Sequence, residues 1–239
     1  MNAIEAALNE LAGFELFADY EKHQILELCH SGQIISSNHR ELLFQYGKEA
    51  HFFGIILSGA YKLTKPSPLG EDVIVHFATP GEALAAFIMA QPSPLYPVSA
   101  IAMGPSRFLK IPKINYITLW KKNSELILRV QNMLSNRMNL LQEQKVMSKS
   151  PLSHKIASLL IHLIDKDPEK GIATNDVKSN ALVKLPMTRK EIADSLGASV
   201  ESVIRIMSDW SKQGVIQTVD QQIFILKVDK IIEHLNEIP

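Results

Sequence analysis

The sequence predicts an α+β protein in which strands and helices occupy different parts of the chain. Between residues 32 and 112, short apolar runs alternate with turns about every ten residues, as in an all-β domain. A long helical repeat of apolar residues follows, and after Pro186 come two short helices with capping residues and then two short strands. At 239 residues the chain can hold two cores. We therefore expect a strand-rich domain (1–113), a long helix (114–150) and a C-terminal domain (151–239).

The strand-rich domain is clearest in the run FFGIILSGAYKLTK, from Phe52 to Lys65. Branched and aromatic residues favour strands, and Ser58 with Gly59 marks a turn, so we expect two strands joined there. Ser67–Glu71 has the composition of another turn, and Val73–Phe77 is the next apolar run.

From Ile114 to Ser148, apolar residues recur at steps of three and four positions, which is the spacing of one face of a helix. The repeat is made by Leu126, Val130, Met133, Leu134, Met138, Leu141 and Met147. Pro151 ends it, because proline cannot continue a helix interior. Two interpretations stand: the helix packs on its own domain, or it forms the seam of a homodimer. Different faces of one helix can serve both.

The C-terminal pattern begins at Thr188, whose hydroxyl can cap a helix, with Glu191 three residues later to complete a capping box. Ile192 and Leu196 give that helix an apolar face. Gly197 then ends the helix, because glycine adopts the left-handed conformation of a helix C-terminus without steric cost.

Ser199 can cap a second helix directly after this turn. Its inward face is expected to be Val203, Ile206, Met207 and Trp210, and its outward face Val200, Glu201, Ser202 and Arg205. A turn at Gln213 and Gly214 follows. Two short strands, Val215–Thr218 and Ile223–Lys227, then form a small hairpin, or wing.

Two helices joined by a tight glycine turn are the arrangement in which the second helix enters the major groove of DNA and contacts base edges. The outward residues have suitable chemistry. Arg205 can donate two hydrogen bonds to a guanine, Glu201 can accept one from a cytosine amino group, and Val200 can contact a thymine methyl. We therefore expect these three residues to read double-stranded DNA.

The DNA backbone needs separate contacts, because phosphate contacts position a protein while base contacts specify the sequence. We expect them from Thr188, Arg189, Lys190, Ser199, Ser202 and Lys212. Residues 151–239 contain 11 Lys and Arg against 12 Asp and Glu, so no general basic excess attracts DNA. A helical pair that serves only packing is the alternative interpretation.

These residues resemble the pattern of the CRP/FNR superfamily of bacterial transcription regulators, and the resemblance extends over nearly the whole chain. In that family a capping Thr, a Glu-Ile-Ala run, a Gly turn and a Glu-x-x-x-Arg helix follow one another. Here they are Thr188, Glu191–Ala193, Gly197, and Glu201 with Arg205. Val200 stands where cyclic-AMP receptor proteins have another base-reading Arg. This resembles the FNR branch and implies half-sites similar to TTGAT.

The resemblance also implies a fold and a set of partners. The N-terminal domain would be a double-stranded β-helix (β-roll) of the cyclic-nucleotide-binding type, with its Leu-Ser-Gly strand pair at Leu57–Gly59 and its Pro-Gly-acid turn at Pro80–Glu82. A dimerisation helix and a winged helix-turn-helix would follow. A symmetric homodimer would present two reading helices about 34 Å apart to a palindromic operator. RNA polymerase is a further implied partner.

The implied cyclic-nucleotide pocket lacks two charged residues of the family's motifs. Counting from Pro80, the ribose-binding Gly-Glu pair falls on Ala85 and Ala86, and the phosphate-binding Arg before Ser99 falls on Val98. A phosphate without its Arg loses a charge-assisted contact. Cyclic AMP is therefore not expected to be the effector.

The purine-contacting Thr and Ser of the family's long helix fall on Leu140 and Leu141. An alternative alignment takes Gly81 and Glu82 as the ribose-binding pair but still supplies no Arg. Glu82 is kept among the expected pocket residues. Three alternatives stay open: a regulator that responds to a cyclic nucleotide through an altered pocket, a regulator active without a ligand, and a module of this fold that has lost DNA binding.

The residue types restrict the cofactors. One cysteine, Cys29, cannot hold the iron–sulfur cluster of the oxygen-sensing FNR branch, which needs about four. Haem could be bound by His76 or His51, but a partly buried structural role is favoured for His76, which lies within the run Val73–Phe77. No Cys/His spacing indicates a metal site.

The remaining expectations concern activity and location. No nucleophile–base pair or phosphate-binding glycine loop is recognisable, so no enzymatic activity is expected. The N-terminus MNAIEAALNELAGF lacks the features of a signal peptide, and no stretch approaches the ~20 apolar residues of a membrane span. A lone cysteine cannot form an internal disulfide. We therefore expect a cytoplasmic protein without a membrane partner.

Overall fold

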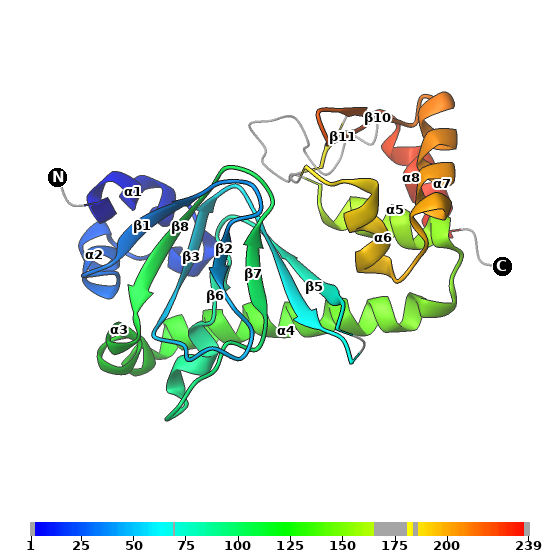
Figure 1. Cartoon of the computed structure of the whole chain (residues 1–239). Coiled ribbons are helices and arrows are strands. Elements are labelled where there is room, and N and C mark those ends of the chain that lie inside the picture. The colour runs from blue at the N-terminus through cyan, green and yellow to red at the C-terminus, as the bar shows by residue number, and fades with distance from the viewer. Residues whose placement is uncertain (1–2, 69, 165–180, 184–185, 237–239) are drawn as a thin grey trace. The chain divides into compact units, whose positions relative to one another are not determined.

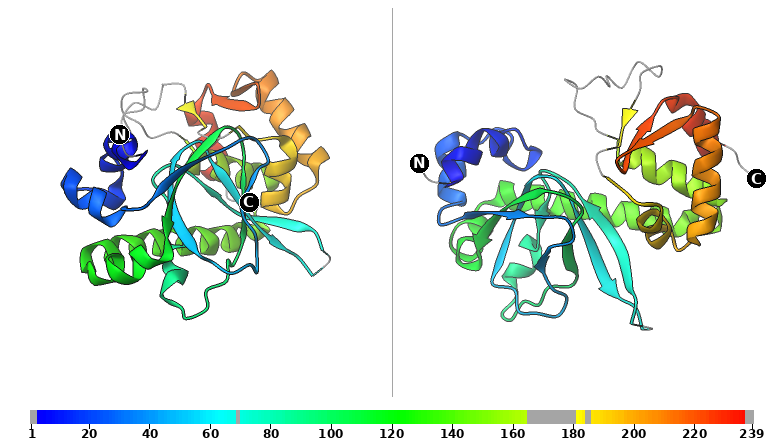
Figure 2. Two further views of the ribbon diagram at one scale, coloured as in Figure 1. Left: turned by 60° about the vertical axis from the view of Figure 1, so that its left-hand side comes forward. Right: turned by 45° about the horizontal axis from the view of Figure 1, so that its top comes forward.

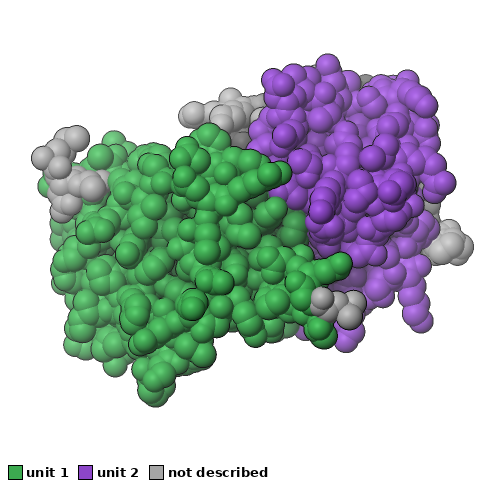
Figure 3. Space-filling model, in the orientation of Figure 1, with its two compact units in different colours: residues 1–140 green, residues 141–239 purple. Residues whose placement is uncertain are grey.

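The computed structural model describes residues 3–68, 70–164, 181–183 and 186–236. The chain divides into two compact units, residues 1–140 and residues 141–239, and each is described by itself (Figure 3). The first contains the sheets of the β-roll and most of the long helix, and the second contains the C-terminal helices and hairpin. The predicted α+β class is confirmed. Among the described helices, none has the length and hydropathy of a membrane span.

Two antiparallel four-stranded sheets form the β-roll, with the orders β1-β8-β3-β6 and β2-β7-β4-β5 (Figure 1). The bounds are β1 Gln33–Ser37, β2 Leu42–Phe44, β3 Phe52–Ser58, β4 Tyr61–Pro66, β5 Asp72–Ala78, β6 Ala83–Leu84, β7 Ser99–Ala102 and β8 Ser106–Pro112. The first strand pairs with the last, Ile34 opposite Leu109, and β2 pairs with β7. Distant parts of this segment are therefore neighbours in both sheets.

The chain crosses from the first sheet to the second at Gly59, between β3 and β4. Gly59 has a φ of 74°, and a Cβ there would lie 2.3 Å from Oγ of Ser106. That hydroxyl accepts a hydrogen bond of 3.1 Å from the backbone N–H of Ala60. The two strands predicted around Ser58 and Gly59 are present, but they pair with other strands and not with each other.

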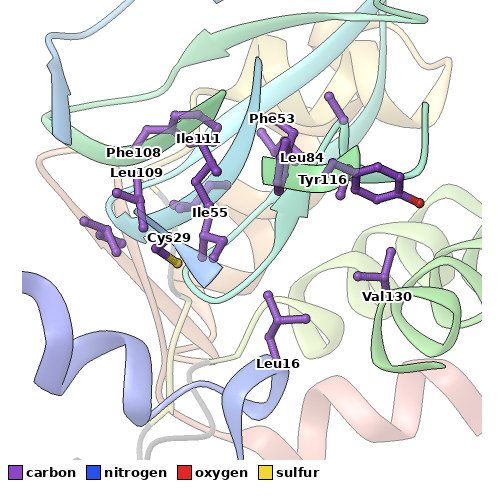
Figure 4. Close-up of a cluster of buried hydrophobic side chains, with 14 of the residues drawn as sticks. Leu16, Cys29, Phe53, Ile55, Leu84, Phe108, Leu109, Ile111, Tyr116 and Val130 are labelled. Carbon is purple, nitrogen blue, oxygen red and sulfur yellow. The ribbon is translucent and has the colours of Figure 1, made fainter. Parts of the chain in front are cut away.

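The core of the first unit lies between the sheets and the flanking helices (Figure 4). These helices are α1 (Ala3–Ala12), η1 (Glu15–Phe17), α2 (Lys22–Leu28), η2 (Ala86–Ala90), α3 (Lys113–Thr118) and η3 (Trp120–Lys122). Trp120 is fully buried, with its ring edge-on to Phe53 at 4.6 Å, and its indole N–H donates to the carbonyl of Leu28 at 3.0 Å. A buried indole of this kind is satisfied at both its apolar and its polar end.

The long helix α4 spans Ser124–Val146. The predicted repeat started earlier, at Ile114, but α3 and η3 occupy that part, and the 3-10 helix η4 (Met147–Lys149) follows α4. Leu126 and Val130 are buried in the core, whereas Met138 is 56%, Leu141 42% and Val146 80% exposed. One face of the helix thus packs on its own domain. Apolar residues nearer its C-terminal end stay exposed in the single chain.

The second unit contains α5 (Leu152–His162), α6 (Arg189–Leu196), α7 (Val200–Lys212) and α8 (Val228–Asn236), with the small sheet β10-β11-β9 beside them (Figure 2). The strands are β9 Ala181–Leu182, β10 Ile216–Val219 and β11 Gln222–Ile225. Trp210 of α7 is buried and stacks on the ring of His234 in α8, with ring centroids 5.1 Å apart. This ring pair links α8 to the buried face of α7.

The predicted wing is present with shifted bounds. Expected at Val215–Thr218 and Ile223–Lys227, its strands begin at Ile216 and Gln222. The Leu226 N–H still donates in register to the carbonyl of Val215, at 2.8 Å, but the Lys227 N–H donates to the same carbonyl at 3.2 Å, and the ladder ends there.

Candidate DNA-reading helix and effector pocket

The entry to α6 is fixed by the capping box that the sequence predicted. The Thr188 hydroxyl accepts from the N–H of Glu191 at 3.2 Å, and the Glu191 carboxylate accepts from the N–H of Thr188 at 3.0 Å. Gly197 closes the helix in the left-handed region, with a φ of 61°. Both end signals therefore act as expected, and they set the direction in which α7 begins.

The helix α7 starts at its predicted cap, since the Ser199 hydroxyl accepts from the N–H of Ser202 at 3.3 Å. Of the four residues expected to face inward, Val203, Met207 and Trp210 are buried and Ile206 is half-buried. Packing on this face holds α7 rigidly. The opposite face therefore presents its side chains from a fixed backbone.

The expected base-reading residues lie at the N-terminal half of α7. Glu201 and Arg205 are exposed, one turn apart on the same face, and Val200 is half-buried beside them. Within the described part of the chain, neither charged side chain has a hydrogen bond or an ion pair. Both can therefore exchange water for a base edge without breaking a protein contact.

Ile204 was not among the outward residues of α7 predicted from the sequence. It is 46% exposed and follows Glu201 by three positions, so a branched apolar side chain lies next to Glu201 on this side of the helix. Alone it is an ordinary surface residue. A helical wheel drawn from Ser199 would have placed it there, and apolar contact with a thymine methyl is the chemistry it offers.

The polar residues expected to contact phosphate have different local partners. The hydroxyls of Thr188 and Ser199 are used in caps, and Oγ of Ser199 donates to Oγ of Ser202 at 2.9 Å. Lys190 is exposed, and the Lys212 ammonium lies 3.9 Å from the Asp209 carboxylate at the C-terminal end of α7. Lys190 and Lys212 are therefore the exposed charges of this set.

Arg189 connects the helix α6 to the wing within the second unit. Its Nη2 donates to Oγ1 of Thr218 in the wing at 2.8 Å. Partial burial lowers the pKa of its guanidinium from the ordinary value. This arginine joins α6 to β10 and retains other N–H groups for a phosphate.

In the first unit, the residues expected at the ribose position are buried alanines. Ala85 adopts a left-handed conformation, with a φ of 63°, directly before η2, and Ala86 is the first residue of that helix. A non-glycine residue in this region costs of order 1 kcal/mol and persists only where the surroundings fix it. Neither alanine can hold a hydroxyl through its side chain.

Val98 is half-buried and packs against the core, and the neighbouring Ser99 hydroxyl accepts from the N–H of Tyr46 at 3.0 Å. On the long helix, Leu140 is half-buried and Leu141 exposed. These expected pocket residues therefore offer apolar surface and one engaged hydroxyl.

Glu82 is different, because its carboxylate is buried among four donors. Oε1 accepts from the N–H and the hydroxyl of Thr79, at 2.8 and 3.1 Å. Oε2 accepts from Nε2 of His76 at 2.9 Å and Nη2 of Arg137 at 2.7 Å. Burial raises the pKa of this carboxyl, but the bonds and charges of His76 and Arg137 and the N–H of Thr79 outweigh it and lower the pKa to about 2.

Comparison with known proteins matches both units. A cyclic nucleotide-binding domain model matches residues 34–123, and a Crp-like helix-turn-helix domain model matches residues 154–233. The chain belongs to the CRP/FNR family of regulators. Members of this family bind DNA, typically as dimers, and are transcription factors without enzymatic activity.

Relatives of this CRP/FNR regulator include the transcriptional activator protein FnrA of Stutzerimonas stutzeri, 26% identical over 78% of this chain and 73% of that protein. The nitrogen fixation regulation protein FixK of Bradyrhizobium diazoefficiens is 24% identical over 85% of this chain and 82% of that protein. The structure of FixK2 from Bradyrhizobium japonicum matches with a TM-score of 0.68 and 17% identity, over 84% of this chain and 96% of that one. This last likeness concerns the fold.

The cofactor sites of the family can be tested against this regulator's residues. It has one cysteine, Cys29, whereas an iron–sulfur cluster of the FNR type needs about four. Cys29 is buried, and burial raises the pKa of its thiol to about 12, so the thiolate does not form readily. His76 is bound to Glu82, and the exposed His51 lies 3.8 Å from Glu49. Over the described residues, no group of three His, Cys, Asp or Glu is arranged for a metal ion.

Proposed function

We propose that the chain is a homodimeric transcription regulator that reads an FNR-like, two-half-site operator with Val200, Glu201 and Arg205 of each subunit. The observation that carries this proposal is the exposed face of α7, where Glu201 and Arg205 stand one turn apart on a rigid helix with no partner among the described residues. A guanidinium can donate twice to a guanine, and the carboxylate can accept from a cytosine. Ile204 adds apolar surface for a thymine methyl.

Phosphate contacts are proposed for Thr188, Arg189, Lys190, Ser199, Ser202 and Lys212. The first residues of α7 also present backbone N–H groups, which favour an anion at a helix N-terminus. Because residues 151–239 carry 11 basic against 12 acidic residues, the contribution of phosphate contacts is expected to be local and the salt dependence moderate.

The dimer is proposed to form along α4. Met138, Leu141 and Val146 are apolar and exposed in the single chain, at three-, five- and eight-residue separations that place them along the C-terminal half of the helix. Their burial against a second copy would remove this surface from water. A symmetric dimer is also what a palindromic operator requires.

We further propose that cyclic AMP is not the effector. The positions that would supply the ribose and phosphate contacts are Ala86 and Val98, and both lack a polar side chain. Glu82, the acid in the alternative alignment, already accepts four hydrogen bonds from the protein. A ribose hydroxyl would have to replace one of these donors, which makes binding through Glu82 unfavourable.

The test is fluorescence anisotropy of a labelled TTGAT-N4-ATCAA duplex titrated with the protein, with and without cyclic AMP, against a scrambled duplex of the same composition. We expect specific binding that is unchanged by the nucleotide. Binding that appears only with cyclic AMP would instead support a regulator with an altered cyclic-nucleotide pocket. Equal affinity for the two duplexes would contradict the proposed operator, and the absence of any DNA complex would favour an interaction module of this fold.

A further inference from the structure

A buried cluster of three ionisable side chains joins the β-roll to the long helix within the first unit. His76 comes from β5, Glu82 from the turn between β5 and β6, and Arg137 from α4. Both His76 and Arg137 donate to the same oxygen, Oε2 of Glu82, at 2.9 and 2.7 Å. All three side chains are more than three-quarters buried, so solvent screens these contacts far less than it does at a surface pair.

Glu82 is a rigid acceptor even before Arg137 is considered. Thr79 donates both its N–H and its hydroxyl to Oε1, which fixes the carboxylate plane. The turn itself is tied to β3, because Gly81 donates to the carbonyl of Ile56 and Ile56 donates to the carbonyl of Glu82, at 2.9 and 3.2 Å. The acceptor for the arginine therefore belongs to the framework of the roll.

Arg137 continues the inward face of α4. The N-terminal half of the helix is held by Leu126 and Val130 in the core and by Arg129, which donates to the carbonyl of Ala18. Met133 and Leu134 pack against the core, and the next inward position is Arg137. Among the described residues, no α4 side chain beyond it has a hydrogen bond to the roll.

We propose that the Glu82–Arg137 ion pair is an internal latch, which holds the part of α4 around Arg137 on the β-roll in the absence of a ligand. In the cyclic-AMP receptors that the chain resembles, the nucleotide itself joins the roll to the long helix. Here the corresponding helix positions are Leu140 and Leu141, and one turn earlier Arg137 makes the connection from protein to protein. The chain thereby docks its helix without an effector.

The latch is also suited to release. Nε of Arg137 is buried and has no hydrogen-bond partner among the residues that the structure describes. A buried N–H without a partner is unfavourable, so undocking the helix regains the hydration of that group and partly offsets the lost ion pair. An effector could shift this equilibrium only by binding the docked and undocked arrangements with different affinities.

The test is hydrogen–deuterium exchange of the full chain without DNA, so its result stands whether or not the proposed operator is correct. In R137Q we expect the backbone amides of residues 131–140 to exchange about tenfold faster or more, because local opening becomes easier. E82Q should give a similar increase, and the double variant E82Q/R137Q should add nothing further, since either change removes the same contact. The matched control is R107Q, which removes the pair between Arg107 and Glu10, with atoms 3.0 Å apart, from the same unit without touching α4.

Unchanged exchange over residues 131–140 in R137Q would overturn the latch, as would an increase of the same size in R107Q. If R137Q fails to fold, R137K retains a charge at this position and loses only the guanidinium geometry. We then expect exchange in R137K to lie between the wild-type and E82Q rates, and wild-type exchange rates in both R137K and E82Q would contradict the proposal.

Discussion

Arg189, the first residue of α6, donates a hydrogen bond of 2.8 Å to the Thr218 hydroxyl in β10. The two residues are 29 positions apart in the sequence, and their contact joins the helix pair to the wing. This hydrogen bond is a direct link between the first turn of α6 and the wing.

The effects of substituting Arg189 and Thr218 on stability should be coupled, because the two residues share one hydrogen bond. R189A and T218V should each lower the free energy of unfolding by about 1 kcal/mol or less, because each removes the same charge-assisted bond, which is exposed to solvent. The double variant should lose no more than the larger single loss. Urea unfolding followed by circular dichroism measures all three, with K190A as the control at the neighbouring exposed lysine. Additive losses would show that the bond contributes nothing.

Arg205 predicts a change in sequence preference. R205A should weaken operator binding by ~1 to 3 kcal/mol and make one base pair of each half-site interchangeable, because a bidentate contact to one base is lost. K212A is the matched comparison, since a phosphate contact should weaken all duplexes equally and lower the salt slope by about 1. Anisotropy titrations over single-base variants of the duplex separate the two patterns. Unaltered specificity in R205A would remove this residue from the reading set.

Substituting the two helix-capping residues should lower stability more than substituting a serine in the middle of a helix. T188A and S199A should each destabilise the second unit by about 1 kcal/mol, because each leaves a helix-terminal N–H without its acceptor. Ser195 lies inside α6, and its hydroxyl donates to the carbonyl of Ile192 at 2.9 Å. S195A should therefore be close to neutral. Equal losses in all three variants, measured by thermal unfolding, would argue against a special role for the caps.

Glu82 predicts an acid-sensitive contribution to stability. Its pKa is lowered from 4.5 to about 2, so the unfolded chain takes up a proton at a higher pH than the folded one. The contribution, on the order of 3 kcal/mol, is fully present above about pH 4.5 and is lost as the pH falls toward 2. The stability difference between wild type and E82Q should shrink over that range in urea titrations. A difference that stays constant with pH would contradict the assignment.

Cys29 predicts an inert thiol. Burial raises its pKa to about 12, and the side chain is inaccessible in the folded chain. Iodoacetamide at pH 8 should leave the native protein unlabelled and should label it in concentrated urea, because only the thiolate reacts and only the unfolded chain exposes it. Rapid labelling of the native protein, detected by mass, would show that the first unit opens readily.

Local signals in the sequence were enough to predict the helix pair α6 and α7 of the second unit. Thr188, Glu191, Gly197 and Ser199 act on backbone groups within a few residues, so their effect does not depend on the remainder of the fold. The strands around Gly59 follow from composition in the same way. What composition did not show is that β3 and β4 belong to different sheets, because each strand finds its partners far away in the sequence.

Non-local contacts account for the features that were missed. Arg137 and Glu82 are 55 positions apart, and the spacing of apolar residues on α4 gives no reason to expect an arginine on the inward face. The short strand β9 pairs with β11 through Phe224 and Leu182, which no pattern within residues 181–182 indicates. By contrast, the start of α4 at Ser124 instead of Ile114 is a local feature that was overlooked: Asn123 is extended, and its Oδ1 accepts from the N–H of Leu126 at 3.1 Å.

Gly59 restricts the sequences that can adopt this fold. Every other amino acid would place a Cβ within 2.5 Å of the Pro105 carbonyl oxygen, and would do so at a φ of 74°. In a library of random single substitutions, position 59 should therefore tolerate replacement less than almost any other surface turn of the first unit. We therefore expect related proteins that keep this crossing between the two sheets to keep a glycine at the position of Gly59.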